Sequence, residues 1–162
     1  MKQLILVRHA KSDWPNVSDL DRPLTERGIQ DCTTAANYFQ NLTDLLDFEV
    51  HVSIAKRTQE TWHNVSKHWR EKPKSQITKE IYEASLGELI AYLDLQNAEK
   101  IIFVGHNPGM ARLGSYLTEA PVLSFPTLSI WHLTTEESWM QGSAKTLHQF
   151  VARADETNPD SD

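Results

Sequence analysis

Two short apolar runs do most to limit the folds open to this chain. Leu4–Val7 and Ile101–Val104 are each bounded by polar residues or glycine. Runs of this length are too short to cross a membrane and are typical of strands buried inside a sheet. Segments with helical spacing of apolar residues separate them, so the sequence predicts strands and helices in alternation.

The remaining elements follow from periodicity and from turn residues. Thr25 is a candidate helix cap, and Ile29, Cys32, Ala36 and Phe39 follow it at helical spacing. In a second helix Trp62, Val65 and Trp69 share one face. Residues 70–76 are predicted to form a surface loop. We expect strands at 2–7, 48–54, 100–106, 127–133 and 144–153, a short extended piece within 77–85, and helices at 25–42, 55–69, 85–95 and 108–117.

This order predicts an α/β fold, a three-layer sandwich with a mostly parallel, mixed central sheet flanked by helices. The last two strands have little helix between them and are expected to form an antiparallel edge. The chain has 162 residues, which suits one domain, predicted over residues 1–153. The acidic tail 154–162 is predicted to be disordered.

Composition excludes several classes of function. The net charge of -6 disfavours binding to nucleic acid or to an anionic membrane surface. The apolar run near the N-terminus is too short for a signal peptide, so we expect a cytoplasmic protein. Cys32 is the only cysteine, which excludes an internal disulfide and is consistent with a small core residue.

Basic side chains stand at the exits of three predicted strands. Arg8 and His9 follow the first strand, Arg57 comes just after the second, and His106 ends the strand that contains "IIFVG". In open sheets of this kind ligands bind beyond the carboxyl ends of the strands. Each residue alone would be ordinary, but together they predict a site for a carboxylate or a phosphate, which guanidinium groups bind well.

A metal site is the competing interpretation for His9 and His106. Zinc needs three or four protein ligands, often at helical spacing, and no such spacing occurs here. Neighbouring arginines would also repel a dication, so no metal or other cofactor is expected. The other histidines are assigned structural roles; they are His51, His63, His68, His132 and His148.

Five blocks resemble, in order and spacing, the histidine phosphatase superfamily with its phosphoglycerate-mutase-like fold, and in particular its SixA-type phosphohistidine phosphatases. The resemblance runs from Lys2 to about Leu133. Two positions depart from the family pattern: Ala10 replaces the glycine of the opening Arg-His-Gly, and Ile54 replaces the proline of a Ser-Pro pair. The blocks are "LVRHAKSDW", "DRPLTERG", "SIAKRTQET", "IYEAS" and "VGHNPG".

The resemblance implies that His9 is a nucleophile that takes up a phosphoryl group. Adjacent arginines disfavour a cationic imidazole, so a neutral ring with an available lone pair is expected. Arg8, Arg57 and His106 would surround the phosphoryl oxygens. N–H groups at the start of the helix after Pro108 would add to them.

Further roles are left open by the sequence. Glu83 matches the position of a proton donor, or it orients an arginine. Arg22 contacts phosphate, or it pairs with Asp19 or Asp21. Asn107 is a phosphate-binding candidate that either caps the following helix or turns the chain. Lys11 and Ser12 lie beside His9 without an assigned role, and Arg112 is expected at the surface.

The predicted function is a metal-independent phosphatase that removes phosphate from phosphohistidine on a signalling or phosphotransfer protein. Inorganic anions such as phosphate or sulfate should bind in the same pocket. A phosphatase for small phosphomonoesters and a non-catalytic module that binds phosphorylated ligands are the alternatives. A short chain leaves no room for a long lid, and an open pocket favours a protein-borne substrate.

Overall fold

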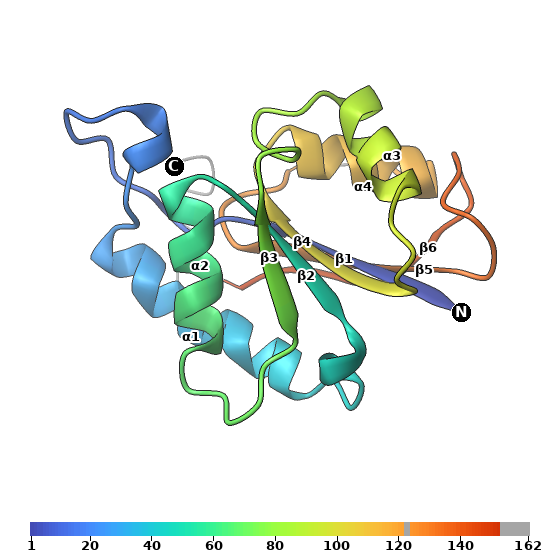
Figure 1. The fold of residues 1–162 in the computed structure, drawn as a ribbon, viewed down its shortest axis with the longest axis horizontal. Coiled ribbons are helices and arrows are strands. Elements are labelled where there is room, and N and C mark those ends of the chain that lie inside the picture. Colours follow the sequence, from blue (N-terminus) through green and yellow to red (C-terminus); the bar gives the residue numbers. More distant parts are fainter. Residues whose placement is uncertain (122–123, 153–162) are drawn as a thin grey trace.

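Six strands form one mixed sheet in the computed structural model, which describes residues 1–121 and 124–152. The strand order across the sheet is β3-β2-β4-β1-β5-β6 (Figure 1). The first four strands in that order run parallel, and the last two pair antiparallel to their neighbours. The mixed sheet with an antiparallel edge is thereby confirmed. The strands are β1 (Lys2–Arg8), β2 (Glu49–Ser53), β3 (Lys74–Thr78), β4 (Lys100–Gly105), β5 (Ser129–Thr135) and β6 (Lys145–Val151).

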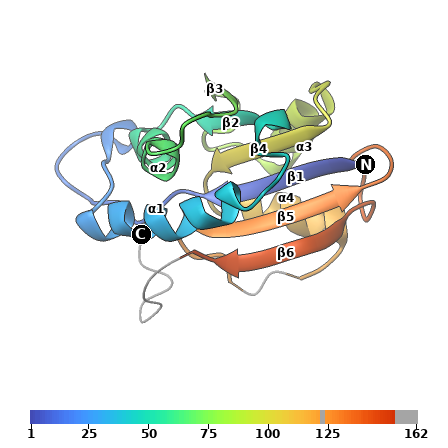
Figure 2. The ribbon, with the colours of Figure 1, turned by 90° about the horizontal axis from the view of Figure 1, so that it is seen from below.

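Helices cover both faces of the sheet (Figures 1 and 2). The helices α1 (Glu26–Gln40) and α2 (Lys56–Ser66) pack on one face, and α3 (Leu86–Asp94) and α4 (Gly109–Thr118) pack on the other. Alternate residues of β1 enter the two cores: Ile5 and Val7 face α1 and α2, while Leu4 and Leu6 face α3 and α4. The three-layer prediction is therefore confirmed. Short 3-10 helices, η1 (Asp19–Asp21) and η2 (Leu45–Asp47), precede α1 and β2.

The buried face of α1 differs from the prediction. Thr25 caps the helix as expected, accepting a hydrogen bond from the Gly28 N–H at 3.0 Å. Ile29 was expected in the core, but 38% of it is exposed. The core face passes through Asp31 instead, next to Cys32. Cys32 and Phe39 are fully buried, as the apolar spacing indicates, so the spacing is wrong only at Ile29.

The short extended piece predicted within residues 77–85 begins earlier than expected. β3 covers Lys74–Thr78, so part of the predicted surface loop is strand. β3 is an edge strand that pairs only with β2, and four of its five side chains are exposed. Such a strand carries no hydrophobic signal, because pairing and not burial fixes its position.

The segment from His106 to α4 settles how the fourth helix begins. Pro108 is the N-cap residue and makes no side-chain cap, and the Asn107–Pro108 peptide bond is cis. Asn107 therefore turns the chain and is not the cap. The predicted tail, 154–162, lies outside the described residues. None of the described helices combines the length and the apolar character needed to cross a membrane.

Candidate active site

Three parallel strands deliver basic side chains to one edge of the sheet. Arg8 at the end of β1 is in register with Gly105 at the end of β4, and the His9 N–H donates to the Gly105 carbonyl at 3.0 Å. The rings of His9 and His106 consequently lie with centroids 5.5 Å apart. Arg57 lies in the first turn of α2, which follows β2. The predicted convergence of distant segments is found at this edge.

His9 is held as one tautomer. Its side chain is 2% exposed, and Nδ1 lies 2.7 Å from the carbonyl oxygen of Ala10. A carbonyl oxygen only accepts hydrogen bonds, so Nδ1 carries the proton in the neutral ring. The lone pair is therefore on Nε2, the atom that a nucleophilic histidine would use.

His106 is fixed between Arg57 and Ser53. Arg57 Nη2 donates to His106 Nδ1 at 3.3 Å, and His106 Nε2 lies 2.8 Å from Ser53 Oγ. Because a guanidinium group can only donate, the proton of the neutral His106 ring is on Nε2 and points to the serine. Two strand ends and the start of α2 are joined through this one ring.

A carboxylate of the chain itself binds Arg57. The backbone oxygen of Asp19 accepts from Arg57 Nη1 at 2.8 Å, and Asp19 Oδ2 accepts from Nη2 at 3.1 Å. The Tyr82 hydroxyl donates to the same Oδ2 at 2.5 Å. Burial raises the pKa of Asp19, but the hydrogen bond from Tyr82 and the charge of Arg57 outweigh it and hold this pKa below its ordinary value. Burial and the hydrogen bond to Asp19 raise the pKa of Tyr82 to about 12.

A cleft of about 430 Å³ opens over Arg57 and His106. Asn107, Glu83 and Arg112 also line it. Glu83 is exposed, and its backbone is in the left-handed region at a φ of 51°. Arg112 is exposed as expected, but it also belongs to this cleft, which the sequence did not indicate.

Arg8 and Arg22 flank this centre. Arg8 Nη1 donates to the Phe125 carbonyl at 3.1 Å. Arg22 is 3% exposed and lies against Asp19, with Nη1 3.4 Å from Oδ1, so one of its two predicted partners is found. Whether Arg8, Arg22 and Asn107 contact phosphate stays a prediction.

The loop after His9 is packed against Arg22 and α1. Arg22 Nη2 donates to Ser12 Oγ at 2.6 Å, and its guanidinium carbon lies 3.2 Å from the centroid of a Trp14 ring. The Thr25 N–H donates to the Lys11 carbonyl at 3.0 Å. Ser12 thus supports Arg22, and the Lys11 backbone anchors α1.

Sequence reasoning missed four residues that hold the site together. Asp19 was considered only as a partner of Arg22, and Tyr82 and Thr61 were not considered. Thr61 is fully buried; its Oγ1 accepts from the Ala10 N–H at 2.9 Å and donates to the Arg57 carbonyl at 2.7 Å. Ser53 was noted only as part of a family motif. These contacts join residues 38 to 63 positions apart, or lie within a helix turn, and no local pattern marks them.

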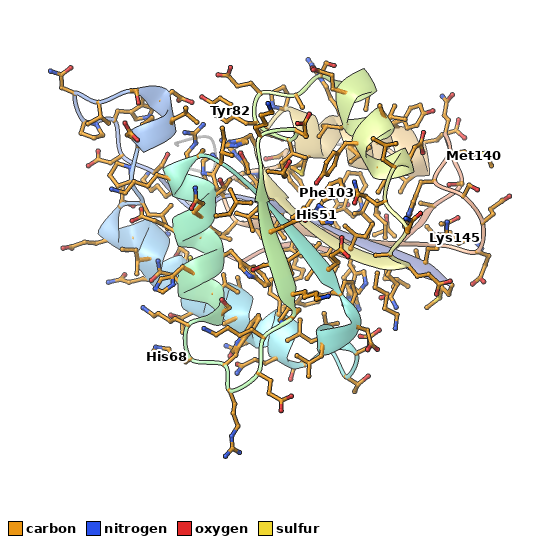
Figure 3. The ribbon with its side chains drawn as sticks, viewed as in Figure 1. His51, His68, Tyr82, Phe103, Met140 and Lys145 are labelled. Carbon is orange, nitrogen blue, oxygen red and sulfur yellow. The ribbon has the colours of Figure 1, made fainter. Side chains whose placement is uncertain are left out.

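The remaining histidines lie away from this centre. His51 is buried against Phe103 in the sheet, and His132 is buried beside Tyr38. His68 lies at the far end of α2 from Tyr82 (Figure 3). Across residues 1–121 and 124–152, no three side chains of His, Cys, Asp or Glu are grouped as a metal site would require.

Comparisons with known proteins agree with this architecture. A protein histidine phosphatase SixA, solved in complex with tungstate, superposes with a TM-score of 0.78 at 22% identity, covering 93% of this chain and 97% of that one. A mycobacterial glucosyl-3-phosphoglycerate phosphatase, solved with VO3, gives a TM-score of 0.66 at 14% identity, covering 96% of this chain and all of the other. At these identities the likeness shows the shared fold.

Sequence comparison supplies the family. An uncharacterized protein of Mycobacterium tuberculosis strain H37Rv is 29% identical over 146 residues, which is 82% of this chain and 89% of the relative. Residues 4–95, more than half of the chain, match the sequence model of the histidine phosphatase superfamily, branch 1. That match includes the strand exits that carry His9 and Arg57. The chain therefore belongs to the histidine phosphatase superfamily.

Proposed function

We propose that the protein is a metal-independent phosphatase that takes the phosphoryl group of its substrate onto Nε2 of His9. The observation that carries this proposal is the hydrogen bond from His9 Nδ1 to Ala10, which leaves the lone pair on Nε2 of a buried ring. Two proteins of the same fold support it, because their structures hold tungstate and VO3, oxyanions related to phosphate.

The reaction consists of two displacements at phosphorus. First, the lone pair of Nε2 bonds to phosphorus while the bond to the leaving group breaks, and the leaving group departs with its electron pair and gains a proton. Then water attacks phosphorus, the P–Nε2 bond breaks and a proton of the water is released. Inorganic phosphate leaves and the neutral His9 is regenerated. The covalent intermediate replaces one difficult step by two easier ones.

Positive charge around the phosphoryl group would supply most of the rate enhancement. Phosphoryl transfer depends on positioning and on stabilising negative charge at the oxygens. We assign that role to Arg8 and Arg57, and to His106 in its protonated form, with Arg22 and Asn107 as further candidates. Because guanidinium groups provide the charge that Mg²⁺ provides elsewhere, activity should persist in EDTA.

The proposed substrate is phosphohistidine on a signalling or phosphotransfer protein. An alkoxide leaving group, whose conjugate acid has a pKa near that of water at ~15.7, needs a strong proton donor. The imidazole of phosphohistidine has a pKa near ~6.5 and leaves with little help. Glu83, exposed on the cleft, is the candidate that would protonate the leaving group and then deprotonate water. A carboxylate exposed to solvent is a weak proton donor. This favours N–P over O–P substrates, because the imidazole leaving group needs less protonation.

Hydrolysis of small phosphomonoesters is the second candidate. The likeness to a glucosyl-3-phosphoglycerate phosphatase favours it, because that protein has the same fold and is named for a small phosphorylated substrate. The two candidates share the His9 chemistry and differ in the leaving group.

Phosphate release from two substrates in the presence of EDTA tests the proposal. The substrates are a chemically phosphorylated histidine protein and p-nitrophenyl phosphate. His9→Ala should abolish release, by about a thousandfold or more. His68→Ala, at the far end of α2, should match the wild type.

Each outcome bears on one part of the proposal. Faster release from the phosphohistidine protein supports the N–P substrate, whereas faster release from the ester supports the second candidate. Activity that survives in His9→Ala, or disappears with EDTA, contradicts the mechanism. Glu83→Gln should slow hydrolysis of an alkyl phosphate such as glycerol phosphate, which has an alkoxide leaving group, more than N–P hydrolysis, and equal slowing would contradict the role given to Glu83.

A further inference from the structure

The guanidinium group of Arg57 is largely occupied by groups of the chain itself. It has five N–H donors. Two donate to Asp19, through the backbone oxygen and through Oδ2, and a third donates to His106. Among the described residues the buried Nε has no hydrogen-bond partner. The forked face that would bind a phosphoryl oxygen therefore already holds a carboxylate.

Asp19 is kept in this position by a residue from a distant segment, Tyr82. It lies in η1, between β1 and α1, whereas Tyr82 lies on the segment between β3 and α3 (Figures 1 and 3). The Tyr82 hydroxyl donates to Asp19 Oδ2 at 2.5 Å, and the Tyr82 ring packs edge-on against His106 with centroids 5.5 Å apart. Asp19, Tyr82, Arg57 and His106 are thus one connected set, joined by hydrogen bonds of 2.5 to 3.3 Å.

We infer that Asp19 is an affinity-determining residue, an internal anion that competes with the phosphoryl group for Arg57. The inference rests on the proposed function, because it concerns the oxyanion site used there. A phosphoryl oxygen that approaches the fork between Nη1 and Nη2 of Arg57 must displace or share the Asp19 carboxylate. The negative charge also repels a phosphate dianion, so product binding is weakened and release is favoured.

If Asp19 competes with the phosphoryl group, removing its charge should change the affinity for an oxyanion in the opposite direction to that expected of a purely structural residue. Asp19→Asn removes the charge but keeps an oxygen acceptor, and the backbone oxygen of residue 19 can still hold Arg57. Loss of a structural contact would weaken the binding of an oxyanion, whereas loss of a competing charge strengthens it. The sign of the change therefore separates the two roles.

The test measures the affinity of inorganic phosphate by calorimetry at low salt. Coulomb's law at a separation of ~6 Å in a water-like dielectric gives about tenfold tighter binding of a dianion to Asp19→Asn. The KM for p-nitrophenyl phosphate should fall in parallel. Asp19→Glu keeps the charge and should stay within about twofold of the wild type.

Asp21→Asn is the matched control. It removes the same charge from the same 3-10 helix, but Asp21 accepts its hydrogen bond from Ser18, at 2.9 Å, and not from Arg57. Phosphate affinity should stay within about twofold of the wild type. If Asp19→Asn fails to fold, Tyr82→Phe serves instead, because it removes the hydroxyl that holds Asp19. That variant should bind phosphate about two- to threefold more tightly.

The outcomes distinguish this inference from the proposed function. Wild-type protein that binds neither phosphate nor vanadate would contradict the oxyanion site itself. Wild-type protein that binds phosphate and turns over substrate, combined with an Asp19→Asn variant that binds phosphate equally or more weakly, would overturn only the role of Asp19. Equal strengthening in Asp21→Asn would also overturn it, because the effect would then be one of overall charge.

Discussion

His132 is a buried titratable residue outside the candidate active site. Its Nε2 lies 2.7 Å from Gln3 Oε1, and its Nδ1 lies 2.5 Å from the Tyr38 hydroxyl. The amide oxygen only accepts, so Nε2 carries the proton and the neutral ring satisfies both contacts. Burial, followed by the charge of His148, lowers the pKa of His132 to about 4. Burial also lowers the pKa of His51, in spite of its contact with Glu49.

The stability of the protein should therefore fall as the pH is lowered from about 6.5 to about 4. In this window an unfolded chain binds a proton at position 132, whereas the folded protein does not, so acid favours unfolding. The depressed pKa corresponds to about 3 kcal/mol of unfolding free energy for His132 at full effect. Urea unfolding at a series of pH values measures this loss of unfolding free energy.

Two variants separate His132 from general acid effects. His132→Asn should show a shallower dependence of the unfolding free energy on pH. At the steepest part of the curve, unfolding of this variant should take up about one proton fewer than unfolding of the wild type. The variant His68→Asn, which removes an exposed imidazole, should keep the slope of the wild type. Equal slopes for His132→Asn and wild type would contradict the assignment.

Single residues of the site were predictable where a side chain able to bind phosphate directly follows a buried strand. His9, Arg57 and His106 are charged or polar side chains directly after apolar strands, which is a pattern that a sequence displays. Asp19 and Tyr82 were not predictable, because their importance comes from contacts across 38 and 63 positions. Both are ordinary residues in polar segments until the fold brings them together.

At the scale of elements, the docking of α1 against the loop after His9 depends on Gly28. A Cβ at this position would overlap the carbonyl oxygen of Lys11, which also accepts from the Thr25 N–H. Helical glycines are normally unfavourable, so this glycine is explained by the close approach of two backbones. The start of α1 and the chain that carries His9 are consequently fixed to each other.

Gly28→Ala should destabilise the protein, although alanine is the better helix former. We expect a loss of about 1–3 kcal/mol of unfolding free energy from the forced shift, together with a lower kcat/KM. Gly87→Ala in α3 is the control, because the nearest atom to its added Cβ, Ser85 Oγ, is 4.0 Å away. That change should stabilise by about 0.5–1 kcal/mol. Thermal and urea unfolding measure the two changes in stability, which should have opposite signs. Stabilisation by Gly28→Ala would contradict the close packing of Gly28 against Lys11.

The elements that the sequence predicted best were the buried ones. β1 and β4 are fully apolar in their centres, and their bounds match the prediction within about two residues. The edge strand β3 was placed too late because its exposed side chains show no alternation. In α1 only Ile29 was misplaced, because the buried face passes through the polar Asp31 instead. Pairing and close packing decide these features, and neither is encoded in local hydrophobicity.

At the scale of the whole molecule, the fold brings segments together that are about a hundred residues apart. Parallel pairing of β1 with β4, and of β4 with β2, puts the carboxyl ends of three strands at one edge. His9, Arg57 and His106 meet there, and α4 begins just beyond His106. The alternation of strands and helices sufficed to predict this convergence. It did not predict which side chains would line the cleft, since Arg112 comes from within α4.

A crystal structure with vanadate is the measurement that tests the central claim most directly. We predict that vanadium is bonded to Nε2 of His9, with its oxygens within hydrogen-bond distance of Arg8, Arg57 and His106. Vanadate bound elsewhere, or bound at this edge of the sheet without contact to His9 Nε2, would contradict it.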